Sequence, residues 1–129
     1  MNLRALTFTT AIALLLGGCA ATSSSSAPYV AFSEQTVGPV FITQEELPAD
    51  IAYDVIGQVQ AKAKTGYSGA RTLYPLLVEE ARKVGANAVI NVYGGRAWSG
   101  VSLAAPYTAG TAVKVKDTEA LKTIDGLYF

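Results

Sequence analysis

Serine, cysteine and lysine are the side chains of this sequence that could act as nucleophiles, and the chain contains no histidine to activate them. A Ser-His-Asp or Cys-His catalytic unit therefore cannot be built. Ser68 lies in Gly-Tyr-Ser-Gly, which is not the Gly-x-Ser-x-Gly spacing of a nucleophile elbow. A Ser–Lys dyad could use Ser99 or Ser102, but nothing in the sequence places a lysine beside either serine. We therefore expect a protein that is not an enzyme.

Metal and cofactor sites are equally hard to assemble from these residue types. Cys19 is the only cysteine, so a thiolate or imidazole metal site cannot form. Residues 94–100, Gly-Gly-Arg-Ala-Trp-Ser-Gly, have the glycines of a phosphate-binding loop but lack its Gly-Lys-Ser/Thr sequence. We expect no metal and no cofactor, and we interpret residues 94–106 as a loop between two strands.

Cys19 is better placed for lipidation during export. Arg4 supplies a positive charge, residues 5–16 are mostly apolar, and Gly17 and Gly18 are the small residues that a signal-peptide cleavage site needs. The apolar run is shorter than the roughly 20 residues of a membrane-spanning helix. A cysteine directly after this pattern resembles the lipobox of bacterial lipoproteins, whose cysteine carries lipid on its thiol and on its new amino group.

This resemblance implies a location and a division of the chain. Residues 1–18 are expected to be the signal peptide, residues 19–35 the lipidated cysteine with a flexible serine-rich tether, and residues 36–129 one domain. Ala20 stands where an Asp would favour inner-membrane retention, so we expect an anchor in the outer membrane of the cell envelope, with the domain facing the periplasm. Acidic and basic residues balance, so no nucleic-acid partner is expected.

Hydrophobic periodicity predicts an α+β fold for the domain. Residues 53–64 alternate between an apolar face that includes Val55 and a polar face that includes Ile56, as in a half-buried strand. Further strands are expected at residues 37–43, near a sheet edge because of Pro39, and at residues 87–93 and 107–116. A main helix is expected over residues 72–84, followed by Gly85 as its stop. A short terminal helix capped by Asp117 or Thr118 is expected to run to about Thr123 and to stop near Gly126.

The expected architecture is a small two-layer domain with one main helix across a sheet of three to four strands, in βαβ-β order. The strand–helix–strand succession predicts a right-handed βαβ crossover or its split form. Leu76, Leu77, Val89 and Val113 are predicted to form the core between helix and sheet. The charged side chains of the helix, Glu80 among them, are predicted to point into solvent.

Four segments resemble the YbjQ-like superfamily and its RcsF-like lipoproteins, which sense envelope stress. They are residues 80–90 (Glu-Ala-Arg-Lys-Val-Gly-Ala-Asn-Ala-Val-Ile), 55–59, 110–115 and 40–47. The resemblance implies a YbjQ/RcsF-like fold and a non-enzymatic protein-binding, stress-sensing or accessory role in the envelope. The disulfides of RcsF-like proteins and the heavy-metal label of the YbjQ family are not carried over, because the domain has no cysteine or histidine. Since YbjQ-like relatives form closed oligomers, a self-assembling structural module is the alternative.

Two surfaces are candidates for binding an envelope protein. The first is the loop with Arg96 and the only tryptophan, Trp98, because both residue types are favoured at binding hot spots. The alternative for Trp98 is that it folds back and seals the end of the core. The second is the polar sheet face, for which a solvated surface is the alternative; it comprises Gln58, Gln60, Lys62, Lys64, Lys114 and Lys116.

We predict that Cys19→Ala releases or mislocalises the protein, because the variant has no thiol to carry the lipid. Membrane fractionation with and without detergent is the measurement. Unchanged, detergent-dependent membrane association of the variant would show that the anchor lies elsewhere.

Overall fold

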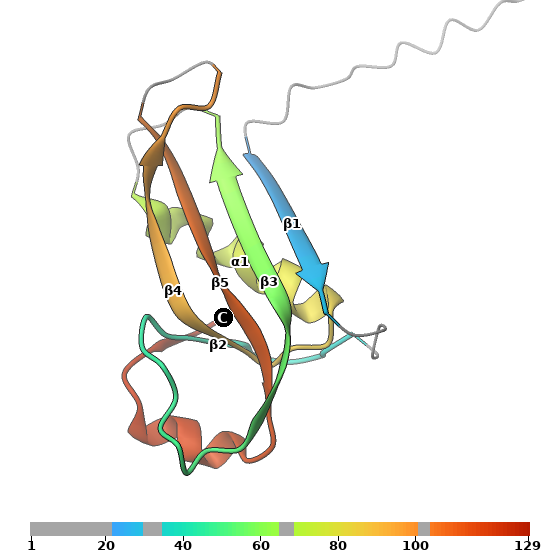
Figure 1. Cartoon of the computed structure of the whole chain (residues 1–129). Coiled ribbons are helices and arrows are strands. Elements are labelled where there is room, and N and C mark those ends of the chain that lie inside the picture. The colour runs from blue at the N-terminus through green and yellow to red at the C-terminus, as the bar shows by residue number, and fades with distance from the viewer. Residues whose placement is uncertain (1–21, 30–34, 65–68, 101–103) are drawn as a thin grey trace, which may run out of the picture.

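Three long strands form the centre of the structure, and they correspond to three of the predicted strand segments. The computed structural model describes residues 22–29, 35–64, 69–100 and 104–129. Within these ranges the long strands are β3 (Tyr53–Ala63), β4 (Ala88–Ala97) and β5 (Ala105–Val115). β5 lies in the middle and pairs antiparallel with both of the others (Figure 1).

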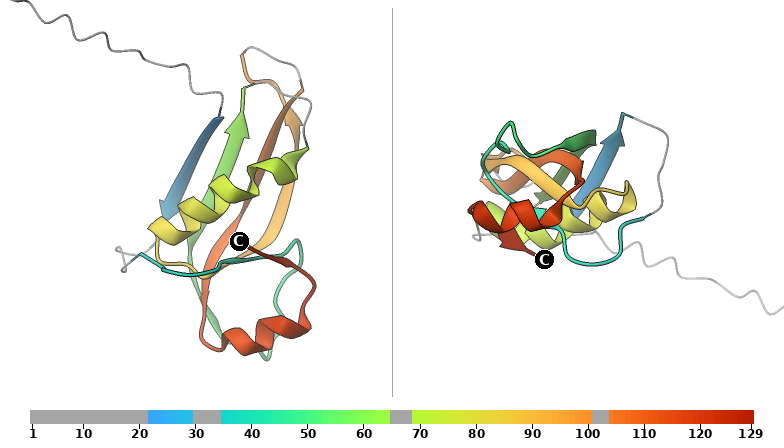
Figure 2. Two further views of the ribbon diagram at one scale, coloured as in Figure 1. Left: turned by 180° about the vertical axis from the view of Figure 1, so that it is seen from behind. Right: turned by 90° about the horizontal axis from the view of Figure 1, so that it is seen from below.

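One main helix covers one face of this sheet (Figure 2). The short 3-10 helix η1 (Ala70–Leu73) leads into α1 (Tyr74–Lys83), and Pro75 lies in its first turn, where no helical hydrogen bond is lost. Gly85, with φ of 81°, ends the helix as predicted. Because β3 and β4 both run antiparallel to β5, they are parallel to each other, and β3-α1-β4 is a split βαβ unit. The α+β class with one main helix is confirmed.

The sheet has more strands than the three to four predicted. Six strands follow the order β1-β3-β5-β4-β2-β6, where β1 is Thr22–Pro28 and β6 is Leu127–Tyr128. The short β2 (Phe41–Ile42) was expected near an edge, but it lies between β4 and β6 and pairs parallel with β4. Residues from both ends of the described chain therefore extend the central sheet.

β1 consists of the serine-rich segment that the sequence predicts as a flexible tether, and this prediction is wrong for residues 22–28. The segment pairs antiparallel with β3 from Thr22 opposite Ala63 to Pro28 opposite Gly57. Gly57 permits this approach, because a Cβ there would lie only 2.3 Å from the carbonyl oxygen of Ala27. The run of serines lacks an apolar face, but pairing with β3 supplies the backbone partners that a strand needs.

Glu80 holds β1 to the helix, although its side chain was expected to point into solvent. The residue is 4% exposed and accepts hydrogen bonds from Ser24 Oγ at 2.7 Å and Lys83 Nζ at 3.0 Å. Burial pushes the pKa of Glu80 up, but the hydrogen bonds from Ser24 and Lys83 and the positive charge of Lys83 outweigh it. The pKa therefore lies below its ordinary value of 4.5.

Core residues lie on both faces of the sheet rather than only under the helix. Leu77 and Val89 are buried beneath α1 as predicted, and Leu76 is only partly buried at a smaller cluster. Val113 lies on the opposite face, because its neighbour Ala112 faces the helix and successive side chains of a strand alternate. The side chains that share the second cluster with Val113 include Phe41, Leu47, Ile51 and Leu121.

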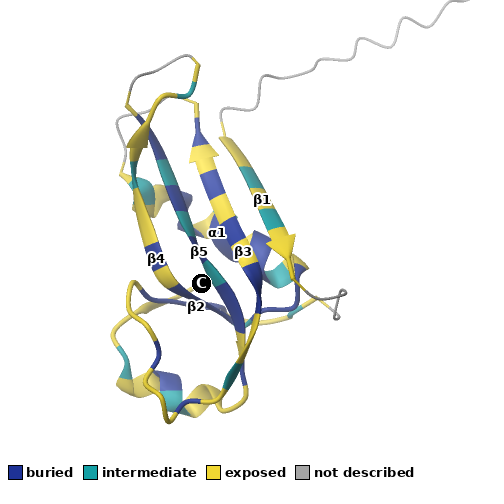
Figure 3. Ribbon diagram, in the orientation of Figure 1, coloured by how far each residue is buried: buried dark blue, intermediate teal, exposed yellow. Residues whose placement is uncertain are grey.

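A bulge in β3 reverses part of the predicted alternation. The register with β5 shifts between Val55 and Gly57, so Val55 is exposed and Ile56 is buried, the opposite of the prediction. From Val59 onward the strand alternates between buried and exposed residues as predicted (Figure 3).

The loop predicted at residues 94–106 is shorter than expected, because β4 continues to Ala97 and β5 begins at Ala105. A second register shift lies between Ile90 and Tyr93, where Asn91 has φ of 51°. After β5 the chain forms the 3-10 helix η2 (Thr118–Thr123), whose bounds match the predicted short helix.

We predict that Leu77→Ala lowers the free energy of unfolding by about 2–5 kcal/mol, because the side chain is fully buried under the sheet. Leu76→Ala is the matched control on the next residue, and its effect should be much smaller because Leu76 is only partly buried. Chemical denaturation of the full chain measures both. Equal effects of the two substitutions would contradict the assigned helix face.

We predict that β1 loosens from the sheet as the pH falls below about 4.5. The folded-state pKa of Glu80 is depressed, so its stabilisation is present above the unfolded-state value of 4.5 and is lost as the pH falls through the lower folded-state value. Hydrogen exchange of the β1 amides, corrected for intrinsic rates, measures this loss.

Glu80→Gln should remove this acid dependence and weaken the contact by about 1 kcal/mol at neutral pH, the difference between a charged and a neutral hydrogen bond. Glu79→Gln is the control, because the Glu79 carboxylate is exposed and pairs with Arg82 rather than with β1. Acid-dependent exchange of β1 that persists in Glu80→Gln would show that another group is responsible.

Candidate functional site

Four of the predicted site residues lie at the same end of the sheet, which we call the tip and define as Lys62, Lys64, Arg96 and Trp98. β3 ends here, β4 ends beside it, and β5 begins here (Figure 1). Ser99 Oγ donates a hydrogen bond to the carbonyl oxygen of Lys64 at 2.5 Å, which joins the segment after β4 to the end of β3. Sequence reasoning treated these residues as two separate surfaces, and the pairing of the strands brings them together.

Trp98 is 66% exposed, so it does not seal the end of the core. The backbone beside it is fixed by Ser99 and by Arg96, whose Nη1 donates to the carbonyl oxygen of Ala104 at 2.9 Å. The tip therefore presents a large aromatic side chain to solvent from a segment held by side-chain hydrogen bonds.

Lys114 and Lys116 do not belong with the lysines of the tip, contrary to the single polar face that was predicted. Lys62 pairs with Tyr107 near the start of β5, whereas Lys114 pairs with Asp54 near its end. Lys114 is also three residues along β5 from Thr111, the partner of Gln58, so strand alternation places it on the opposite face of the sheet from Gln58. The lysines among the six polar residues are thus divided between two ends of the sheet, while Gln58 and Gln60 lie in the middle of β3.

The uncovered face of the sheet, opposite α1, carries a hollow of about 260 Å³. We call this surface the open face; its defining residues are Ser25, Gln58, Gln60, Tyr93 and Ala109. Gln58 Nε2 donates to Thr111 Oγ1 at 3.0 Å and Gln60 Nε2 donates to Ser25 Oγ at 2.8 Å, so the polar side chains are held in place.

Tyr93 borders the open face and is the site residue that sequence reasoning missed. It is 59% exposed, and its ring meets Tyr107 edge-on with the ring centroids 6.5 Å apart. The sequence predicted that Tyr93 lies in a strand. It did not show which face of the sheet its side chain is on, because the register of β4 shifts between Ile90 and Tyr93. Tyrosine combines apolar area with a hydroxyl group, a combination that is frequent in binding surfaces.

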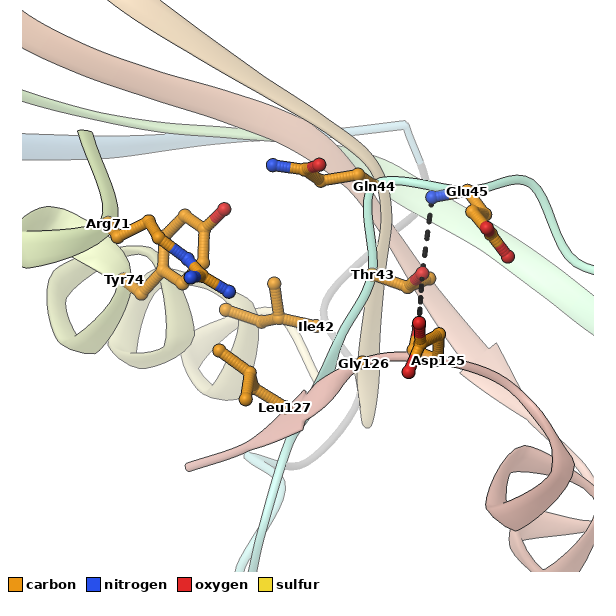
Figure 4. A pocket seen from close by; sticks show the side chains of 9 residues that line it. All are labelled: Ile42, Thr43, Gln44, Glu45, Arg71, Tyr74, Asp125, Gly126 and Leu127. Carbon is orange, nitrogen blue, oxygen red and sulfur yellow. Dashed lines mark hydrogen bonds between the residues drawn. The ribbon is translucent and has the colours of Figure 1, made fainter. Parts of the chain in front are cut away.

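A second pocket, of about 240 Å³, lies between η1, the segment after β2 and the segment before β6 (Figure 4). Arg71 and Tyr74 approach it from the helical side, while Thr43, Glu45 and Asp125 lie across from them. Thr43 Oγ1 donates to the Asp125 carbonyl oxygen at 2.8 Å and accepts from the Glu45 amide at 3.1 Å. The Thr43 hydroxyl thus links the segment after β2 to the segment before β6. In this pocket, Arg71 is the positively charged residue that could attract an anion.

Ser99 is the described serine that the sequence suggested for a Ser–Lys dyad. Ser99 lies beside Lys64, but its hydroxyl donates to the lysine's backbone carbonyl, which is not the geometry of a Ser–Lys dyad. Over residues 22–29, 35–64, 69–100 and 104–129 no group of three or more acidic, cysteine or histidine side chains is arranged to hold a metal. In the same ranges no helix has the length and apolar character needed to cross a bilayer. Cys19, Ser68 and Ser102 lie outside the described residues.

No family model, curated protein or solved structure matches this chain.

We predict that Trp98→Ala changes the free energy of unfolding by no more than about 0.5 kcal/mol, because an exposed side chain contributes little to packing. Tyr74→Ala provides the contrast: its ring is buried under the sheet, and its loss should cost about 3 kcal/mol. Thermal or denaturant unfolding compares the two. A loss of several kcal/mol in Trp98→Ala would mean that the indole packs on the core.

Proposed function

We propose that this chain is a lipid-anchored protein of the bacterial envelope that binds another envelope protein through its open face, without catalysis. The anchor is Cys19, in the outer membrane with the domain on the periplasmic side. The proposal also assigns the chain a YbjQ/RcsF-like fold and a sensor or accessory role, on the strength of the resemblance at residues 40–47, 55–59, 80–90 and 110–115.

The observation that carries the binding proposal is the exposed ring of Tyr93 beside a hollow lined by serine, glutamine and apolar residues, none of which is charged. Because Gln58 and Gln60 are already hydrogen-bonded to neighbouring strands, they lose little conformational freedom on binding. Aromatic residues surrounded by neutral polar ones are typical of protein-binding surfaces, where charges are depleted at the centre.

A second candidate is self-assembly, and the position of β1 favours it. β1 is the outermost strand of the described sheet, so β3 occupies one of its edges and no described strand pairs with the other. An unpaired edge can add a strand from a second copy of the chain. The serine side chains are small and uncharged, so they present no repulsive charge to such a copy.

In-cell photocrosslinking separates these functions. A photoreactive amino acid replaces Tyr93 on the open face, Ser23 on β1, or Lys116 at the far end of the sheet as the exposed control. Binding of an envelope protein predicts crosslinks to a different protein from position 93 and none from position 116. Self-assembly predicts crosslinks to the chain itself from position 23, and a multimeric mass for the purified protein. The absence of a product from position 93 would contradict the binding proposal.

A further inference from the structure

The first strand begins close to the proposed anchor. Thr22, the first residue of β1, is three residues after Cys19, and it pairs with Ala63 at the end of β3. Three extended residues span at most about 10 Å. With Cys19 in the bilayer, as the proposed function requires, the end of the sheet that contains Ala63 is held within that distance of the lipid. This end is the tip.

The charge of the tip has one sign. Lys62, Lys64 and Arg96 are exposed there, and the sequence contains no acidic residue in the segments 55–78 and 81–116. The chain has a net charge of zero, but its acidic and basic residues are not evenly distributed along the sheet. At the opposite end, Asp54 pairs with Lys114 near the end of β5, and Asp117 and Glu119 lie where η2 begins.

Trp98 completes a surface suited to a lipid headgroup layer. Tryptophan is enriched at membrane interfaces because its ring is apolar and its N–H group is polar. Lysine and arginine close to a bilayer are attracted to anionic headgroups. We propose that the tip lies against the phospholipid surface, with the Trp98 ring at headgroup level, as a second membrane contact beside the lipid anchor.

The distance to the anchor favours lipid over a protein partner at this surface. A protein bound to the tip would have to fit between the sheet and a bilayer that the anchor keeps about 10 Å away. If the tip contacts the membrane, the strands point away from the membrane surface. The open face, which is the side of the sheet, then stays accessible to an envelope protein.

The single tryptophan makes the contact directly measurable, because all indole fluorescence comes from Trp98. The full chain is purified in its membrane-extracted form and reconstituted into phosphatidylethanolamine vesicles with or without phosphatidylglycerol. Some vesicles carry lipids brominated near the headgroup as quenchers. We expect a blue-shifted emission that brominated lipid quenches, more strongly with phosphatidylglycerol and less at high salt. Emission that is unshifted and unquenched in both vesicle types would overturn the proposal.

Charge reversal at the two ends of the sheet supplies matched variants. Lys64→Glu places a negative charge in the tip, and Lys116→Glu places the same charge on an exposed lysine at the far end. Each cation near an anionic surface changes the binding equilibrium about fivefold, so quenching in Lys64→Glu should fall by at least that factor in the docking equilibrium. Quenching in Lys116→Glu should stay at the wild-type level. Equal losses in both variants would show a general charge effect and contradict a specific tip.

The mass of the purified chain distinguishes failure of this inference from failure of the anchor. A lipid-modified Cys19 together with unquenched Trp98 overturns the tip contact and leaves the anchor and the open face in place. An unmodified Cys19 overturns the anchor, and with it the reason for the tip to face lipid. A photocrosslinker at position 98 that captures a protein while the vesicles leave Trp98 unquenched also overturns the inference.

Discussion

The double pairing of β5 is the interaction on which the rest of the structure depends. β3 and β4 are joined through α1 but do not touch as partners, so each is held in the sheet by β5. The Asn87 side chain reinforces this at the start of β4, with its Nδ2 donating to the Val115 carbonyl at 2.9 Å and its Oδ1 accepting from the Val115 amide at 2.7 Å. Because β5 runs antiparallel to both neighbours, it begins at the tip, where β3 and β4 end. Its other end leads to η2.

The two faces of the central sheet are covered differently. Beneath α1 the packing uses small residues such as Ala61, Ala81 and Ala112, which are fully buried and let the helix lie close to the strands. On the other side, the half near η2 is covered by a second cluster around Phe41 and Leu121, and only the half toward the tip stays open. The open face is therefore a restricted area of sheet held rigid from behind.

Local patterns predicted the elements better than they predicted the sheet. The stripe that contains Leu77 and Ala81, the stop at Gly85 and the bounds of η2 follow from helical periodicity and capping chemistry. β1 could not be found in this way, because a run of serines has no hydrophobic period and its strand structure depends on β3. The side of Val113 was also hidden, since alternation shows which residues share a face but not which face the helix covers.

The candidate surfaces show the same limit. Arg96 and Trp98 could be singled out by residue type, but their proximity to Lys64 depends on a contact between segments about 30 residues apart. Lys62 and Lys114 each belong to the polar side of an alternating strand pattern, and only the register between β3 and β5 shows that they lie at different ends of the sheet. The pocket around Arg71 and Thr43 is lined by three segments that are far apart in the sequence, so no local sequence pattern predicts it.

If Cys19 carries the proposed lipid anchor, the docking of β1 also determines how far the domain can travel from the membrane. While β1 is paired, only Ala20 and Ala21 lie between Cys19 and the first residue of the sheet, and these three residue steps span at most about 10 Å. Directly after β1, the Tyr29 amide donates a hydrogen bond to the carbonyl of Ile56. The next such backbone hydrogen bond along the described chain is from the Thr36 amide to the carbonyl of Arg82. If β1 left the sheet, Thr36, which is seventeen residues after Cys19, would be the next contact, and the chain between them could span about 60 Å. The same serines thus serve as a strand that keeps the domain close to the lipid and as a stored length of chain that would widen its search radius severalfold.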